Sequence, residues 1–169
     1  LILRFFALLF MSYGEEYIFR KKLLNYFDQK ISNILALLLI SVSYCWIKAS
    51  QFDLGIMHLT SLFLLSMAAG LKSYNQHFTL GAGFIAGLVI ILHPILGLPI
   101  LGSSLPGFTL LKYQFNPQLL GDEAYLTQLI TGGVGGPLSS FTLQFFLLFL
   151  VIKDLLKNKK TLLSKPTES

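Results

Sequence analysis

Charged side chains are scarce in this sequence, and cysteine is almost absent. Of the 169 residues, 12% are charged and 54% are apolar, whereas soluble domains carry roughly 25% charged residues. A domain of this size has too much surface to cover with so few polar groups. This argues against a soluble enzyme, a nucleic-acid-binding protein and a disordered chain. The single cysteine, Cys45, excludes an internal disulfide and a multi-cysteine metal site.

Long apolar runs are the positive feature of the sequence, and they predict an all-α integral membrane protein. A membrane-spanning helix needs about 20 mostly apolar residues. Charge-free stretches near this length cover residues 31–47, 54–71, 78–101 and 138–152. Residues 1–13 are interpreted as the remaining part of a further membrane span. We therefore predict a polytopic helix bundle with about four to five membrane segments. It forms one membrane domain over residues 1–153, truncated at its N-terminus, with a basic cytoplasmic tail over residues 154–169.

The basic residues are unevenly distributed between the two ends of these segments. In the simplest layout, residues 14–30 form a loop, and Glu15 and Lys48 lie near opposite faces of the membrane. Two basic residues, Lys48 and Lys112, then fall on one side. Ten fall on the other side: Arg20, Lys21, Lys22, Lys30, Lys72, Lys153, Lys157, Lys159, Lys160 and Lys165. The positive-inside rule then places the C-terminus in the cytoplasm or its topological equivalent. The net charge of +5 is accordingly assigned to the anionic headgroups of the lipid bilayer rather than to nucleic acid.

The stretch with candidate catalytic side chains is residues 14–20, Gly-Glu-Glu-Tyr-Ile-Phe-Arg. On a helix, Glu16 and Arg20 share a face, while Glu15 is rotated by about 100° from Glu16. One carboxylate is then held by the guanidinium, and the other is left free to act as a general base on water. The alternative is an acidic helix N-terminus after Gly14, with an ordinary ion pair at the membrane surface. The spacing alone favours this alternative.

The pattern Glu-Glu-x-x-x-Arg, with aromatic residues between, resembles the first motif of the CPBP family, which contains the CAAX prenyl proteases and bacteriocin-processing proteins. Members of this family are polytopic membrane peptidases in which a glutamate of this motif and two histidines on later helices surround a water molecule. The resemblance covers roughly residues 14–152. It implies an endopeptidase with Glu15, Glu16 and Arg20 in its catalytic site and a prenylated protein or peptide as substrate. It implies no cofactor, and a divalent metal only if the site is active.

The two histidines of the family pattern are missing at the expected spacing. The second motif falls on residues 44–48, Tyr-Cys-Trp-Ile-Lys, where Lys48 takes the histidine position. The third falls on residues 83–87, Gly-Phe-Ile-Ala-Gly, where Ile85 takes it. Lys48 either pairs with the glutamates, which makes them weaker bases, or marks a helix end and snorkels to the interface. The second interpretation of Lys48 is the favoured one.

Three histidines lie elsewhere, at His58, His77 and His93. His58 ends the stretch Leu-Gly-Ile-Met-His, which imitates the second motif ten residues late, and it is a catalytic candidate only if the alignment has slipped. For each lone histidine, a hydrogen-bonded polar residue inside the bundle is the more common role. The three show no metal-ligand spacing such as His-Glu-x-x-His, so no metal site is predicted.

Two glycine patterns are interpreted as structural. Gly83 and Gly87 form a small-x-x-x-small pair that lets another helix approach closely. Residues 131–137, Thr-Gly-Gly-Val-Gly-Gly-Pro, lack the ending of a phosphate-binding loop. They predict a turn before the final helix, with Pro137 near its first position.

Three functions remain open on these residues. The sequence favours a degenerate, non-catalytic CPBP-like protein that binds a membrane partner, either another membrane protein or a lipid, because both expected histidines are replaced. One alternative is an active peptidase that uses Glu15 and Glu16 to activate water, with His58 supplying the imidazole. The other is a small transporter subunit whose intramembrane carboxylates carry protons or cations.

Overall fold

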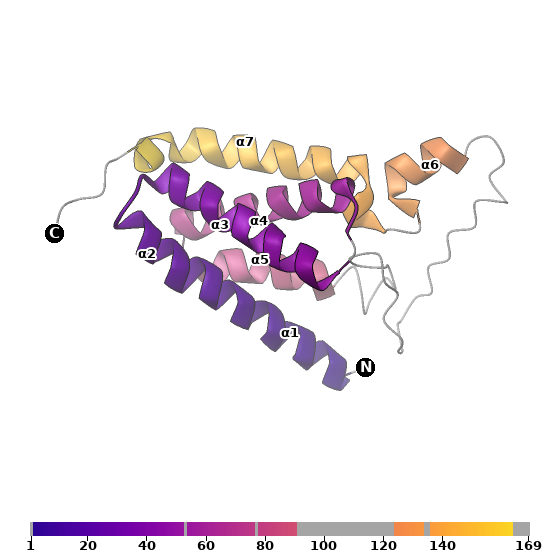
Figure 1. Ribbon diagram of the computed structural model, residues 1–169, viewed down its shortest axis with the longest axis horizontal. Helices are drawn as coiled ribbons and strands as arrows, with labels where there is room; N and C mark the ends of the chain where they lie inside the picture. The colour runs from indigo at the N-terminus through magenta and orange to yellow at the C-terminus, as the bar shows by residue number, and fades with distance from the viewer. Residues whose placement is uncertain (1, 53, 77, 91–123, 134–135, 164–169) are drawn as a thin grey trace.

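The computed structural model describes residues 2–52, 54–76, 78–90, 124–133 and 136–163, and every regular element among them is a helix. The chain begins with α1 (Ile2–Glu16), which continues through the π-helix η1 (Tyr17–Leu23) into α2 (Leu24–Asp28). The residues at both junctions keep right-handed helical backbone angles. Residues 2–28 therefore form one long helix, which is the lowest helix in Figure 1.

The remaining helices follow after short turns or after stretches outside the described residues. They are α3 (Asn33–Gln51), α4 (Ile56–Gln76), α5 (Phe78–Ile90), α6 (Ala124–Thr131), the short 3₁₀-helix η6 (Pro137–Ser139) and α7 (Phe141–Leu163).

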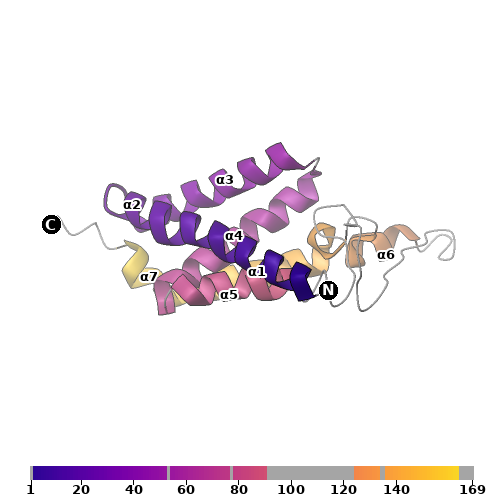
Figure 2. The same cartoon turned by 90° about the horizontal axis from the view of Figure 1, so that it is seen from below.

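Helix α4 lies at the centre of the bundle and packs against α3, α5 and α7. The first helix packs against α5 on the side away from α7 (Figures 1 and 2). Small and aliphatic residues of α4 pack in the core, where Ala68, Ala69 and Leu71 are fully buried. Element η1 packs against α5 and α3, and its Arg20 side chain reaches α4 at Ser66.

Two described helices are long and apolar enough to cross a membrane, Asn33–Gln51 and Ile56–Tyr74. They correspond to the predicted segments 31–47 and 54–71. The segment predicted at 138–152 falls largely on α7, and the one at 1–13 falls on α1. The segment 78–101 begins with α5, and its second half lies outside the described residues. The prediction of an all-α chain is thus confirmed for the described residues.

The prediction that residues 14–30 form a loop is wrong. This stretch is helical from Gly14 to Asp28, and its inner side is buried at Phe19, Arg20 and Leu24. The loop assignment rested on the charges of the segment, but the structure turns two of these charges, Glu16 and Arg20, inward. At the other end of the chain, α7 runs on past position 153 to Leu163, so the sequence predicted as a tail begins inside a helix.

The turn predicted before the final helix is confirmed. Gly132, Gly133 and Gly136 have φ angles of 87°, 52° and 77°, which L-residues rarely adopt. A Cβ atom on Gly132 would lie 1.8 Å from the carbonyl oxygen of Gly136, so only glycine fits there. Pro137 opens η6, and α7 begins four residues later at Phe141.

Candidate functional site

The candidate site lies where the long first helix changes from α-helix to π-helix. In a π-helix each N–H bonds to the carbonyl five residues earlier, so the turn is wider, and such turns are frequent at functional sites. Glu16 ends α1, and Arg20 lies in the middle of η1. Both side chains face the inside of the bundle, with 0% and 2% of each residue exposed.

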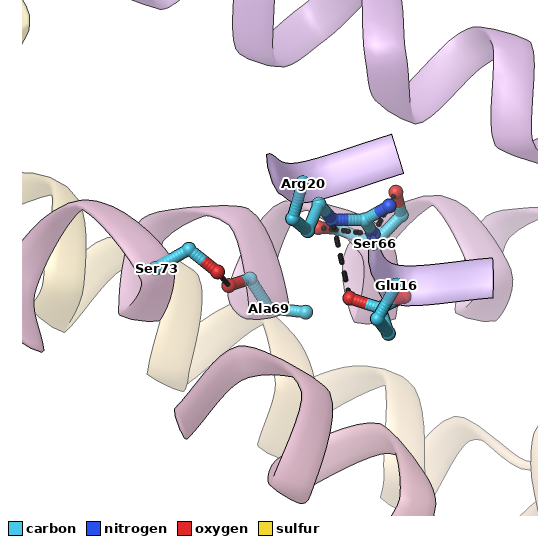
Figure 3. Close-up of polar contacts among 5 residues, drawn as sticks. All are labelled: Glu16, Arg20, Ser66, Ala69 and Ser73. Carbon is cyan, nitrogen blue, oxygen red and sulfur yellow. Dashed lines mark hydrogen bonds and ion pairs between the residues drawn. The ribbon is translucent and has the colours of Figure 1, made fainter. Parts of the chain in front are cut away.

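Arg20 connects the first helix to α4. Its Nη2 atom donates to the Ser66 hydroxyl at 2.7 Å and to the Ser66 carbonyl oxygen at 3.1 Å (Figure 3). The guanidinium carbon also lies 5.4 Å from the centre of the Tyr44 ring, a distance at which the ring face attracts a cation. Arg20 is therefore held by both α3 and α4.

Glu16 forms an ion pair with Arg20 inside the bundle. Its Oε2 atom lies 3.5 Å from Arg20 Nε, which is too long for a good hydrogen bond. Within the described part of the chain, neither Glu16 oxygen has a hydrogen-bond partner, and Nε and Nη1 of Arg20 have none either. A buried carboxylate with unused acceptor positions is costly to keep. The pair therefore retains the capacity to bind a further polar group.

Glu15 forms a second ion pair, with Lys48 of α3. Lys48 Nζ donates to Glu15 Oε1 at 2.7 Å, and the two side chains are 9% and 26% exposed. Tyr44, one turn earlier in α3, has its ring centre 5.6 Å from Lys48 Nζ. The edge of Phe19 meets this ring at a centroid distance of 5.3 Å. An aromatic ring, that of Tyr44, thus packs beside both cations.

The structure decides between the alternatives left open for these residues. The predicted pairing of Glu16 with Arg20 on one helix face is confirmed. The interpretation of Glu15 and Glu16 as a helix N-terminus at the membrane surface is wrong, because the helix continues through both of them. The expectation of a carboxylate left free is also wrong, since Lys48 binds Glu15. Lys48 accordingly does not snorkel to an interface.

Of the three histidine candidates, the described residues include His58 alone. His58 is half-buried in α4, eight residues before Ser66, which corresponds to about 12 Å of helix rise. His77 and His93 lie outside the described residues. At the position expected for the third histidine, Ile85 is buried in an apolar cluster with Leu65, Ala69 and Leu147.

Sequence reasoning missed the residues of α4 that complete the site. Ser66 binds Arg20, and Gly70 leaves room beside it. A Cβ atom on Gly70 would lie 2.3 Å from Leu37 Cδ1 and 4.0 Å from Arg20 Nε. The run Ser-Met-Ala-Ala-Gly over residues 66–70 was the available signal, because small residues mark the places where membrane helices approach closely.

The cationic side chains of the site would compete with a metal ion for its carboxylates. Among the residues that the structure describes, no three His, Cys, Asp or Glu side chains gather in a way that could hold a metal ion. Both carboxylates already face a cationic side chain. A metal ion here would have to compete with Arg20 and Lys48.

Comparison with known proteins returns no relative: no family model, no curated protein and no solved structure matches this chain. The resemblance to the CPBP family therefore rests on the motif residues themselves.

Proposed function

We propose that this chain is a multi-pass membrane protein of CPBP-like layout that acts as a non-catalytic binding partner within the bilayer. Its C-terminus lies on the cytoplasmic side, as the distribution of basic residues predicts. Its partner is another membrane protein or a lipid held beside the first helix.

The exposed apolar surface supports a membrane location. Large apolar side chains are exposed along three helices: Phe6, Phe10 and Ile18 on the first helix, Leu35, Val42 and Trp46 on α3, and Phe145, Phe149 and Leu156 on α7. Apolar surface this extensive marks a membrane or protein contact rather than a water-exposed face. Together with the two span-length helices, it is what a bundle surrounded by lipid would present.

The observation that carries the non-catalytic assignment is the contact between Lys48 and Glu15 at 2.7 Å. A general base must accept a proton from water, and an ammonium group bound to the carboxylate opposes this. In the family that the motif resembles, this position holds an imidazole. Ile85, at the other expected imidazole position, offers no polar atom. The site keeps the charged residues of the motif but uses them to hold helices together.

A cleavage assay tests this proposal. The full chain is reconstituted into lipid vesicles and incubated with prenylated and unprenylated peptides, beside the Glu15→Gln and Glu16→Gln variants. We expect no cleavage by the wild type above that of either variant. Cleavage that both variants and His58→Ala abolish would contradict the proposal and establish the peptidase alternative.

A binding assay tests the partner. A photoreactive residue at Phe10, which is exposed on α1, is activated in native membranes and in vesicles of lipid alone. We expect one discrete cross-linked product, protein or lipid, that is absent when the photoreactive residue replaces Gln144, which is buried on α7. Equal, diffuse labelling from both positions would count against a specific partner.

Glu16 supports a second candidate function. Its carboxylate is buried, and neither oxygen has a hydrogen-bond partner among the described residues, which suits a group that takes up and releases a proton inside a membrane. In this case vesicles containing the wild type would carry a proton or cation flux that Glu16→Gln abolishes. Vesicles containing Glu15→Gln serve as the matched control.

A further inference from the structure

The outer side of η1, α2 and the turn that follows carries a row of lysine and tyrosine side chains. Lys21, Lys22, Tyr26 and Lys30 are exposed, with Tyr17 half-buried beside them; we call these five residues the basic strip. The opposite side of the same segment buries Phe19 and Leu24 in the core. This segment is therefore amphipathic, with cations and aromatic rings on its outer face.

The lysines of the basic strip lie against its tyrosines. Lys21 and Lys22 place Nζ 5.2 Å and 5.9 Å from the centre of the Tyr17 ring. Lys30 places Nζ 4.3 Å from the Tyr26 ring centre and donates to the Tyr26 hydroxyl. Lysine and tyrosine together on one helix face are typical of the boundary between lipid and water.

Other lysines add to the positive charge at this end of the bundle. The end of α2 and the end of α7 lie together at the left in Figures 1 and 2. Lys153, Lys157 and Lys159 are exposed on this part of α7. The nearby acids are engaged: Asp28 accepts a hydrogen bond from Tyr74, and Asp154 lies 3.4 Å from Lys72 Nζ.

The first helix is too long to lie wholly within the hydrocarbon of a bilayer. The 27 residues from Ile2 to Asp28 extend for about 40 Å at a rise of 1.5 Å per residue. The hydrocarbon core of a bilayer is about 30 Å thick. With the exposed apolar side chains Phe6 and Phe10 of α1 inside that core, the lysines after Arg20 reach the headgroups.

We infer that the basic strip binds the phosphate groups of anionic phospholipids and so anchors this end of the bundle in a negatively charged leaflet. The inference rests on the membrane location proposed above and adds a lipid class and a binding surface. It does not depend on whether the Glu15 and Glu16 site is catalytic. The exposed apolar residues that continue from the strip along α1 favour a lipid over a nucleic acid as the source of phosphate.

Competition between two lipids tests the inference. The full chain in detergent is mixed with equal amounts of phosphatidylglycerol and phosphatidylcholine, and the retained lipids are counted by native mass spectrometry. We expect the wild type to retain mainly phosphatidylglycerol. Replacing Lys21, Lys22 and Lys30 together by Gln should lower this preference by about fivefold per lysine. Replacing the same three by Arg should preserve it, because the charge is kept.

Several results would overturn the inference. They are equal retention of the two lipids by the wild type, an unchanged preference in the Gln variant, or release of phosphatidylglycerol by an equal concentration of inorganic phosphate. Should the Gln variant fail to fold, the wild type alone remains decisive, since its preference must fall as ionic strength rises. Flotation with phosphatidylcholine vesicles separates the two proposals. A chain that fails to insert contradicts the membrane location, whereas one that inserts without preferring the anionic lipid contradicts this inference alone.

Discussion

Arg20 connects the first helix to both α3 and α4. It donates to Ser66, lies 3.5 Å from Glu16 and faces the ring of Tyr44. Arginine suits this position better than lysine, because its planar guanidinium group can contact a hydroxyl, a carbonyl and a carboxylate at the same time. The side chain that the sequence suggested as a catalytic helper therefore also holds three helices together.

Replacing Arg20 by Met should lower the free energy of unfolding by about 3–5 kcal/mol, because Glu16 would remain buried without a cation. The double variant Glu16→Gln/Arg20→Met should recover part of this loss. The measurement is chemical unfolding in detergent, with Lys21→Met as the control, since Lys21 is exposed on the next position. Equal losses in Arg20→Met and Lys21→Met would contradict the buried role of Arg20.

Asp28 lies at the end of α2, outside the two span-length helices. We expect this residue to make the free energy of unfolding depend on pH. Burial raises the pKa of Asp28, and the hydrogen bond from Tyr74 offsets part of the increase. Because the pKa is higher in the folded state, stability from this group is fully present below the unfolded pKa of about 3.9. It is lost as the pH rises through the folded pKa.

The variant Asp28→Asn should therefore show a flatter stability profile than the wild type, since its amide oxygen still accepts the hydrogen bond from Tyr74 but does not ionise. Thermal unfolding in detergent from acid to neutral pH checks this. Parallel profiles for the two proteins would show that Asp28 does not titrate as its burial predicts.

The sequence indicates contacts within one helix but not those between helices. The Glu16–Arg20 pair follows from a spacing of four residues. Ser66 lies 46 residues from Arg20 and Lys48 lies 33 residues from Glu15, so these contacts depend on how the helices pack. The π-helix that carries Arg20 inward has no sequence signal of its own.

At the scale of elements, two glycine positions of α5 differ in their surroundings. A Cβ atom on Gly81 would lie 2.3 Å from Ser73 Oγ and 2.6 Å from the Ala69 carbonyl oxygen of α4. Ser73 itself donates to that carbonyl oxygen (Figure 3). On Gly83 a Cβ atom would meet nothing within 4 Å among the described residues. Gly81, rather than Gly83, allows the close approach of α4 and α5.

Gly81→Ala should lower the free energy of unfolding by about 1–3 kcal/mol, because the added methyl group overlaps a backbone oxygen. Gly83→Ala should be neutral or stabilise the chain by up to about 1 kcal/mol, because alanine favours helix and meets no neighbour. Unfolding of both variants in the same detergent provides the comparison. A Gly83→Ala variant as unstable as Gly81→Ala would contradict this packing.

The elements themselves were largely predictable, because apolar runs of helical length dominate the sequence. Segments 31–47 and 54–71 correspond to α3 and α4 to within a few residues. The loop predicted over residues 14–30 failed for a physical reason. Arg20 points into the bundle and is buried, whereas Lys21 and Lys22 point outward and are exposed. A count of charges does not show which way each side chain points.

At the scale of the whole molecule, the described residues form a bundle with a buried ionic site in the middle and lysines gathered at one end. The ionic site holds the first helix to α3 and α4, so binding of a partner there would be coupled to packing of the bundle. The lysines are the residues that we infer to bind anionic headgroups. Neither property follows from the motif resemblance, which predicts the site residues but not their partners.

The contact between Glu15 and Lys48 is the central claim of this account, and a double-mutant cycle tests it most directly. The free energy of unfolding is measured for the wild type, Glu15→Gln, Lys48→Met and the double variant in one detergent. We predict a coupling energy of about 1–3 kcal/mol, because each single change leaves a largely buried charge without its partner. A coupling energy near zero would contradict the account, since Lys48 would then not hold Glu15.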